Sequence, residues 1–107
     1  MNAPETKQYL YLLEPSRPEL ATDPTAWTEG ELQIARDHFQ HLQRAAAAGQ
    51  LILAGRCQDN VGPALAIFEA DSDEAARRFM ESDPFISSGL MRGKLHPYKV
   101  AVHRARF

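Results

Sequence analysis

The longest patterned run of hydrophobic residues spans residues 28–48 and has the period of a helix. Its apolar residues recur at alternating steps of three and four: Leu32, Ala35, Phe39, Leu42 and Ala46. This spacing places them on one face of a helix, which we predict to be the buried face. Thr28 and Glu31 have the spacing of a capping box at the helix start, and Trp27 is placed to form a hydrophobic staple with Leu32. Gly49 is placed to end the helix in the left-handed conformation.

Shorter apolar runs predict four strands around this helix. The runs cover residues 8–13, 51–54, 64–69 and 95–103. In the first run, Tyr9, Tyr11 and Leu13 alternate with Leu10 and Leu12, so both faces of that strand are apolar. A sheet with one face in water would show polar residues on that face, so we expect both faces of this strand to be covered.

The segments between these runs predict two connections and a second helix. Residues 14–27 carry three prolines and no hydrophobic period, which is typical of a long loop, whereas residues 55–63 are dense in turn residues and indicate a hairpin. The second helix is predicted to begin at Asp71, because Asp71 and Glu74 have capping spacing. It is predicted to end at the Ser-Asp-Pro of residues 82–84, since the residue before a proline disfavours helical geometry.

The resulting order of elements, βαββαβ, predicts an α+β protein with a ferredoxin-like fold. In this fold, two helices lie on one face of a four-stranded antiparallel sheet. We expect a second copy to cover the other apolar face, giving a homodimer by sheet-to-sheet packing. Pro97 within the last run indicates an edge strand or the first residues of a strand. One domain is predicted over residues 1–107, with a frayed N-terminus at residues 1–7.

Composition and charge narrow the classes of function. The chain is 44% hydrophobic and 24% charged, as is typical of soluble globular proteins, and its net charge of −2 argues against a nucleic-acid-binding role. Cys57 is the only cysteine, so no disulfide forms within the chain. No apolar run approaches the roughly 20 residues that span a bilayer, and residues 1–8 lack the layout of a signal peptide. We therefore predict a cytoplasmic protein that binds neither nucleic acid nor membrane.

Two of the four histidines, His38 and His41, lie in the long predicted helix. On a helical wheel, His38 lies about 70° from the centre of the predicted buried stripe and His41 about 130° from it. His38 is therefore expected at the rim of the core, where its ring either packs against the sheet or reaches a cleft, and His41 is expected to face solvent. The H-x-x-H spacing alone is a weak metal motif because no third ligand with matching spacing follows, so we predict no metal and no cofactor.

Asp83 is the other candidate for chemistry, because Pro84 restricts its backbone. The alternative is a turn aspartate that accepts a hydrogen bond from its own backbone. Ser82 lies in the same loop, but no G-x-S-x-G motif surrounds it, which disfavours a serine hydrolase. Arg17, in the proline-rich loop, is either a binding residue or a solvated charge.

Three stretches of the chain, HFQHLQRAAAAGQLILAGR, ALAIFEADSDEAARRFMESDPFISSGL and LHPYKVAV, resemble the YciI-like (YCII-related) family. The most specific parts are a helix histidine followed by a G-x-L-x-x-A-G run leading into a strand, and the D-P-F turn. The resemblance covers nearly the whole chain and implies a dimeric α+β barrel. It also implies a catalytic His–Asp pair, which falls on His38 and Asp83.

These residues favour a small enzyme in which Asp83 holds one imidazole nitrogen of His38 while the other nitrogen moves a proton. The substrate would carry an ionisable hydroxyl or a proton next to a carbonyl. The resemblance extends to a branch that dehydrochlorinates chlorinated hydroxyaromatics, so a lyase-type elimination is one version. We expect the substrate to be contacted by Arg17, Ser82 and Phe85. The alternatives are a non-catalytic ligand-binding or interaction module and a cofactor-free monooxygenase or isomerase.

Overall fold

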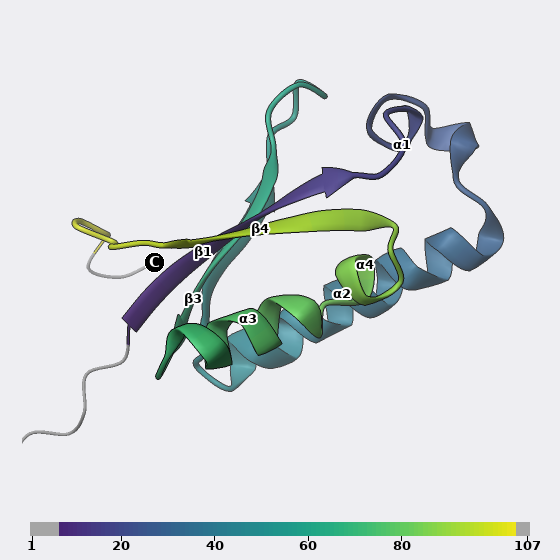
Figure 1. Cartoon of the computed structure of the whole chain (residues 1–107). Coiled ribbons are helices and arrows are strands. Elements are labelled where there is room, and N and C mark those ends of the chain that lie inside the picture. Colours follow the sequence, from purple (N-terminus) through teal and green to yellow (C-terminus); the bar gives the residue numbers. More distant parts are fainter. Residues whose placement is uncertain (1–6, 105–107) are drawn as a thin grey trace, which may run out of the picture.

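Four antiparallel strands form one sheet, and the helices α2, α3 and α4 lie against one face of it (Figure 1). The computed structural model describes residues 7–104, so residues 1–6 of the predicted frayed N-terminus lie outside it, whereas Lys7 is the first residue of a strand and pairs with Ala70. The strands are β1 (Lys7–Pro15), β2 (Leu51–Arg56), β3 (Ala64–Ala70) and β4 (Met91–Pro97). They lie in the order β2-β3-β1-β4, so β1 and β3 are central and β2 and β4 are edges. This is the ferredoxin-like α+β arrangement that the order of elements predicts.

The helices comprise two long ones and three short ones. They are α1 (Glu19–Thr22), the 3₁₀ helix η1 (Pro24–Ala26), α2 (Glu29–Ala47), α3 (Asp73–Glu81) and α4 (Pro84–Ser87). The segment predicted as one long loop therefore holds α1 and η1. The first residue of α3 is also later than predicted: the cap is Ser72, whose hydroxyl accepts a hydrogen bond from the amide of Ala75, and not Asp71. None of the helices in the described residues has the length and apolar character needed to cross a bilayer.

Helix α2 begins and ends as its sequence predicts, but the face that it buries only partly overlaps the predicted one. Thr28 and Glu31 form the reciprocal capping box, and Gly49 follows the helix with a φ of 84°. However, Leu32 is 43% exposed and Phe39 61% exposed, whereas Ala35 and Leu42 of the predicted stripe do pack against the core. The inward face consists of Ile34, Ala35, His38, His41, Leu42 and Ala45. This set also has helical spacing, but it includes two histidines, and a count of apolar residues alone therefore selects a stripe that is rotated away from the buried face.

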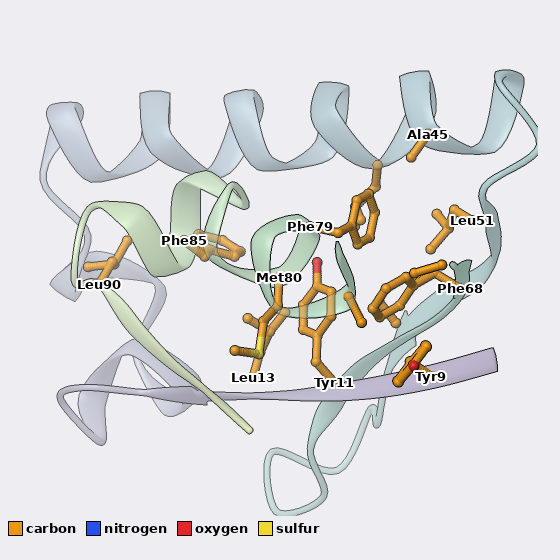
Figure 2. Close-up of a cluster of buried hydrophobic side chains, with 14 of the residues drawn as sticks. Tyr9, Tyr11, Leu13, Ala45, Leu51, Phe68, Phe79, Met80, Phe85 and Leu90 are labelled. Carbon is orange, nitrogen blue, oxygen red and sulfur yellow. The ribbon is translucent and has the colours of Figure 1, made fainter. Parts of the chain in front are cut away.

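The core lies between the sheet and the helices and is centred on four aromatic rings (Figure 2). Tyr9 and Tyr11 project from β1 toward Phe68 of β3 and Phe79 of α3. The ring centroids of Phe68 and Phe79 are 4.5 Å apart, and Tyr11 packs edge-on against both. Ala66, which pairs with Tyr11 across the strands, is fully buried and leaves space for these rings.

The last strand lies earlier in the chain than predicted, since β4 begins at Met91 and not at residue 95. Its residues alternate between exposed and half-buried positions, and the charged and glycine residues among them hide this pattern in the sequence. Gly93 allows β4 to approach the helices, because a Cβ there would lie 2.6 Å from Ile86 and 2.8 Å from Met80. Pro97 ends the strand and lies on a sheet edge, as a residue without an amide hydrogen should.

The face of the sheet opposite the helices has no described element packed on it (Figure 1). Two rows of side chains cross it, because the strands are in register there. One row is Leu53, Ile67, Leu10 and His96, and the other is Gly55, Leu65, Leu12 and Lys94. Both faces of β1 are therefore apolar, as its sequence predicts. Tyr9, Tyr11 and Leu13 on the helix side are buried, whereas Leu10 and Leu12 on the open face are half-buried.

We predict that Thr28→Ala lowers the free energy of unfolding by about 1 kcal/mol, because it leaves the amide of Glu31 without its capping oxygen. Urea denaturation followed by circular dichroism measures the change. The matched control is Thr22→Ala, which removes a hydroxyl that makes no hydrogen bond to the described residues. Equal stability of the two variants would contradict the capping role.

Candidate active site

Asp83 is the one charged side chain among residues 7–104 that is wholly buried, with 0% of its surface exposed. It is the N-terminal cap of α4, and Pro84 is the first residue of that helix. Its Oδ1 accepts a hydrogen bond of 2.9 Å from the amide of Phe85. The local turn therefore holds the carboxylate in place, as the turn interpretation of Asp83 predicts.

The same carboxylate is paired with His38 of α2. Nδ1 of His38 lies 2.7 Å from Oδ1 of Asp83, and the His38 side chain is 14% exposed. An ionised carboxylate only accepts hydrogen bonds, so Nδ1 carries the hydrogen in this arrangement. The other ring nitrogen, Nε2, has no partner among the described residues and, unlike Nε2 of His41, is not sealed from solvent. The pair therefore presents one unoccupied imidazole nitrogen at the rim of the core.

The ring of one aromatic residue, Phe85, contacts the His38 imidazole, and a second ring packs behind it. The ring of Phe85 stacks on it with a centroid distance of 4.1 Å and an interplanar angle of 29°. Trp27 packs against Phe85 at 6.1 Å and donates its indole N–H to the carbonyl of Leu20. Stacking and the Asp83 hydrogen bond together restrict the orientation of the imidazole.

The remaining oxygen of the carboxylate is bound to Tyr11 of β1. The Tyr11 hydroxyl donates a hydrogen bond of 2.6 Å to Oδ2 of Asp83, and both groups are buried. Burial alone would raise the pKa of Asp83, but the hydrogen bonds from His38 and Tyr11 outweigh it and hold that pKa below its ordinary value. Asp83 is therefore ionised at neutral pH. Burial, reinforced by the charge of Asp83, strongly raises the pKa of Tyr11.

Tyr11 is the site residue that sequence reasoning missed. Its position in an alternating strand correctly predicts a buried tyrosine in line with Tyr9 and Leu13. No local signal in the sequence indicates its partner, because Asp83 is 72 positions away along the chain.

His41 faces the core and not the solvent, contrary to the prediction from the helical wheel. Its ring packs at 5.3 Å against Phe79, and its Nε2 is buried without a hydrogen-bond partner. Burial lowers the pKa of His41, and the nearby Arg44 and His38 act in the same direction against the opposing charge of Asp83. The inward face of α2 therefore carries two histidines, of which only His38 has a partner for its buried nitrogen.

The three residues predicted to bind substrate are placed differently. Phe85 contacts the imidazole of His38 directly. The hydroxyl of Ser82 donates a 2.6 Å hydrogen bond to the carbonyl of Phe79. Arg17 makes a two-pronged ion pair with Glu31, at 2.9 and 3.1 Å, and this bond is the main reason that the pKa of Glu31 is lowered to about 2. Arg17 thereby ties the loop after β1 to the first turn of α2.

Two surface hollows lie away from the His38–Asp83 pair. One, of about 530 Å³, lies between the start of β1 and the end of β4, and the other, of about 280 Å³, lies beside the turn after α2. Neither is lined by His38 or Asp83. No cluster of three or more potential metal ligands occurs within residues 7–104.

The comparisons with known proteins agree with this fold. Residues 9–94 match the YCII-related domain, so the chain belongs to the YCII-related family. No curated protein matches it by sequence. Among solved structures, it is similar to 5-chloro-2-hydroxyhydroquinone dehydrochlorinase (TftG) from Burkholderia phenoliruptrix AC1100, in complex with 2,5-dihydroxybenzoquinone. The TM-score is 0.63 at 19% sequence identity, over 86% of this chain and 93% of that chain, and a likeness at this identity establishes the fold.

We predict that His41→Phe flattens the loss of stability at acidic pH. Because burial lowers the pKa of His41 below its ordinary value of 6.5, the unfolded chain binds this proton at a higher pH than the folded protein does. The free energy of unfolding that neutral, buried His41 contributes is fully present above pH 6.5. It is lost as the pH falls from 6.5 through the lowered pKa of His41. Urea titrations from about pH 8 to about pH 5 measure the slope, which should be shallower in the variant.

The control for this experiment is His103→Phe, in the exposed tail after β4. It should keep the wild-type slope. A His41→Phe variant with that same slope would show that burial of His41 does not affect its protonation.

Proposed function

We propose that this protein is an enzyme that moves a proton with the His38–Asp83 pair as general acid and base. The observation that carries this proposal is the 2.7 Å bond from a buried, ionised carboxylate to one imidazole nitrogen, while the other nitrogen bonds to none of residues 7–104. A pair held in this way is the usual arrangement for a catalytic imidazole.

In the proposed mechanism, Asp83 keeps the hydrogen on Nδ1 of His38, so Nε2 presents its lone pair to the substrate. Nε2 takes a proton from a substrate hydroxyl or from a carbon next to a carbonyl, and the imidazole becomes positively charged. The carboxylate of Asp83 stabilises that charge while remaining ionised. The same nitrogen then returns the proton to the product or to water.

The surroundings of His38 support a flat, aromatic or quinone-like substrate. Phe85 stacks on the imidazole and Trp27 packs against Phe85, so the pair lies in aromatic surroundings that favour an aromatic ligand. The solved dehydrochlorinase described above has the same fold and is named for its action on a chlorinated hydroxyhydroquinone. The corresponding reaction here would have two proton transfers. His38 would move a hydroxyl proton of the substrate to the ring carbon that carries chlorine, giving the keto form, and would then remove a second hydroxyl proton as chloride leaves, so that HCl is lost overall and a quinone forms. Arg17 and Ser82 remain candidate substrate contacts in this proposal.

We predict that His38→Ala and Asp83→Asn each lower kcat by about 100-fold or more, because each removes one half of the proton-transfer pair. The assay is chloride release from 5-chloro-2-hydroxyhydroquinone, the compound for which the similar dehydrochlorinase is named. Asp71→Asn is the matched control, since it neutralises an exposed aspartate on the loop before α3. Full turnover by folded His38→Ala and Asp83→Asn variants would overturn the proposal.

We also propose that two copies pair through the open face of the sheet. The support is the two apolar rows centred on Leu10, Leu12, Leu65 and Ile67, which end at His96 and Lys94 on the β4 edge. Pairing about a twofold axis would bring this surface against itself and remove its leucines from water. The occupant is a second copy because the same apolar rows then serve both sides of the interface.

We predict that Leu10→Lys converts the dimer to monomer, because it places a charge at the centre of the proposed interface. Size-exclusion chromatography with light scattering should give twice the 12.0 kDa chain mass for the wild type and the single mass for the variant. The control is Phe39→Lys, which replaces a hydrophobic side chain exposed on α2, away from the open face. A monomeric wild type would contradict the proposal, as would a monomer caused equally by both variants.

A further inference from the structure

We propose that Tyr11 is a positioning residue of the His38–Asp83 pair, which holds the carboxylate with Oδ1 toward His38 and limits the basicity of the imidazole. The inference rests on the proposed function and deepens it, since it adds a third residue that acts on His38 through Asp83. The observation is the chain of two short bonds: Tyr11 to Oδ2 at 2.6 Å and Oδ1 to His38 at 2.7 Å.

The position of the Tyr11 hydroxyl is set by its packing. The residue is fully buried near the middle of the central strand β1, and its side chain extends from the sheet toward the helix layer (Figure 2). Phe68 and Phe79 pack edge-on against its ring, at centroid distances of 5.7 and 6.2 Å. A ring so enclosed has one orientation, and therefore the hydroxyl defines where Oδ2 of Asp83 must lie.

Holding Oδ2 has a consequence for the other oxygen. The two oxygens of a carboxylate lie in one plane and turn together. Oδ2 of Asp83 is bound to Tyr11 and Oδ1 to the amide of Phe85, so rotation of the carboxylate away from His38 would break a buried hydrogen bond. Tyr11 thus acts on the direction in which Oδ1 faces His38, in addition to its contribution to the core.

Tyr11 also acts on charge. Its hydrogen bond draws negative charge toward Oδ2 and is one of the bonds that keep the pKa of Asp83 low. Without this hydrogen bond, the negative charge of the buried carboxylate would be less well stabilised. A proton added to His38 or Asp83 would then be held more tightly, because it offsets that charge. The two groups titrate together, so this change should appear as uptake of the first proton at a higher pH.

The chain contains a matched control for this hydrogen bond. Tyr9 lies two residues away on the same face of β1, is also buried, and donates a hydrogen bond of the same 2.6 Å length to an aspartate, Asp73. Asp73 lies in the first turn of α3 and makes no hydrogen bond with His38. Tyr9→Phe therefore removes a similar hydroxyl from the same strand without touching the pair.

The experiment is an NMR titration of the His38 ring protons in the full-length protein, with the resonances assigned by their absence in His38→Gln. It compares wild type, Tyr11→Phe, Tyr9→Phe, Asp83→Asn and the double variant Tyr11→Phe/Asp83→Asn. We expect Tyr11→Phe to move the titration midpoint up by about one pH unit, the scale of one lost hydrogen bond to a charged group. Tyr9→Phe should leave the midpoint unchanged, and Tyr11→Phe should have no further effect when Asp83 is already asparagine.

Two results would overturn the inference. One is a His38 titration midpoint that moves no more in Tyr11→Phe than in Tyr9→Phe. The other is a shift caused by Tyr11→Phe that is equally large in the wild type and in Asp83→Asn. If Tyr11→Phe does not fold, 3-fluorotyrosine placed at residue 11 keeps the hydroxyl but makes it a stronger donor. The midpoint should then move to lower pH, and an upward or absent shift would contradict the role of Tyr11.

The titration requires no substrate, so its outcome is separate from that of the proposed function. Turnover could depend on His38 and Asp83 while Tyr11→Phe shifts the His38 titration equally with and without the Asp83 carboxylate. That combination would remove only Tyr11 from the mechanism. The reverse result, a coupled titration with no loss of turnover in His38→Ala, would remove the acid–base proposal and leave Tyr11 as the residue that controls protonation of the pair.

Discussion

The burial of one carboxylate, that of Asp83, is the constraint on which the candidate site depends. An ionised group withdrawn from water has to meet donors from the protein, and removing one partner of a buried ion pair typically costs about 3–5 kcal/mol. Asp83 meets three donors: the amide of Phe85, the imidazole of His38 and the hydroxyl of Tyr11. They come from α4, α2 and β1, so a single charge connects a turn, the long helix and the central strand.

This connection explains how one residue serves two roles that look like alternatives in the sequence. Asp83 is a turn aspartate, because it caps α4 and bonds the backbone two residues on. It is also the partner of His38, because the cap places its carboxylate under α2. The turn supplies rigidity that the proposed proton-transfer pair would need, since the local backbone bond to Phe85 holds the carboxylate independently of the imidazole.

The two faces of the sheet meet different requirements. The face toward the helices is filled by aromatic rings and carries the site at its rim, where α2 presents two histidines. His38 has the Asp83 partner, whereas His41 has a buried nitrogen without one, an arrangement that disfavours a charge on His41. The opposite face carries leucines in register and no titratable group near its centre. Chemistry and the proposed self-association are therefore kept on separate sides of the same four strands.

The sequence alone determined the features that arise within a few residues of the chain. The capping box of Thr28, the left-handed Gly49 and the turn before Pro84 depend on bonds across two to four positions, and the order of elements follows from hydrophobic period. The family resemblance also directed attention to His38 and Asp83. The tertiary structure alone decided which face of α2 is buried, where β4 begins and that Tyr11 completes the site. The two bonds to Asp83 join residues 45 and 72 positions apart, and the start of β4 depends on its pairing with β1 at the other end of the chain. No local pattern encodes which distant side chain will meet a buried charge.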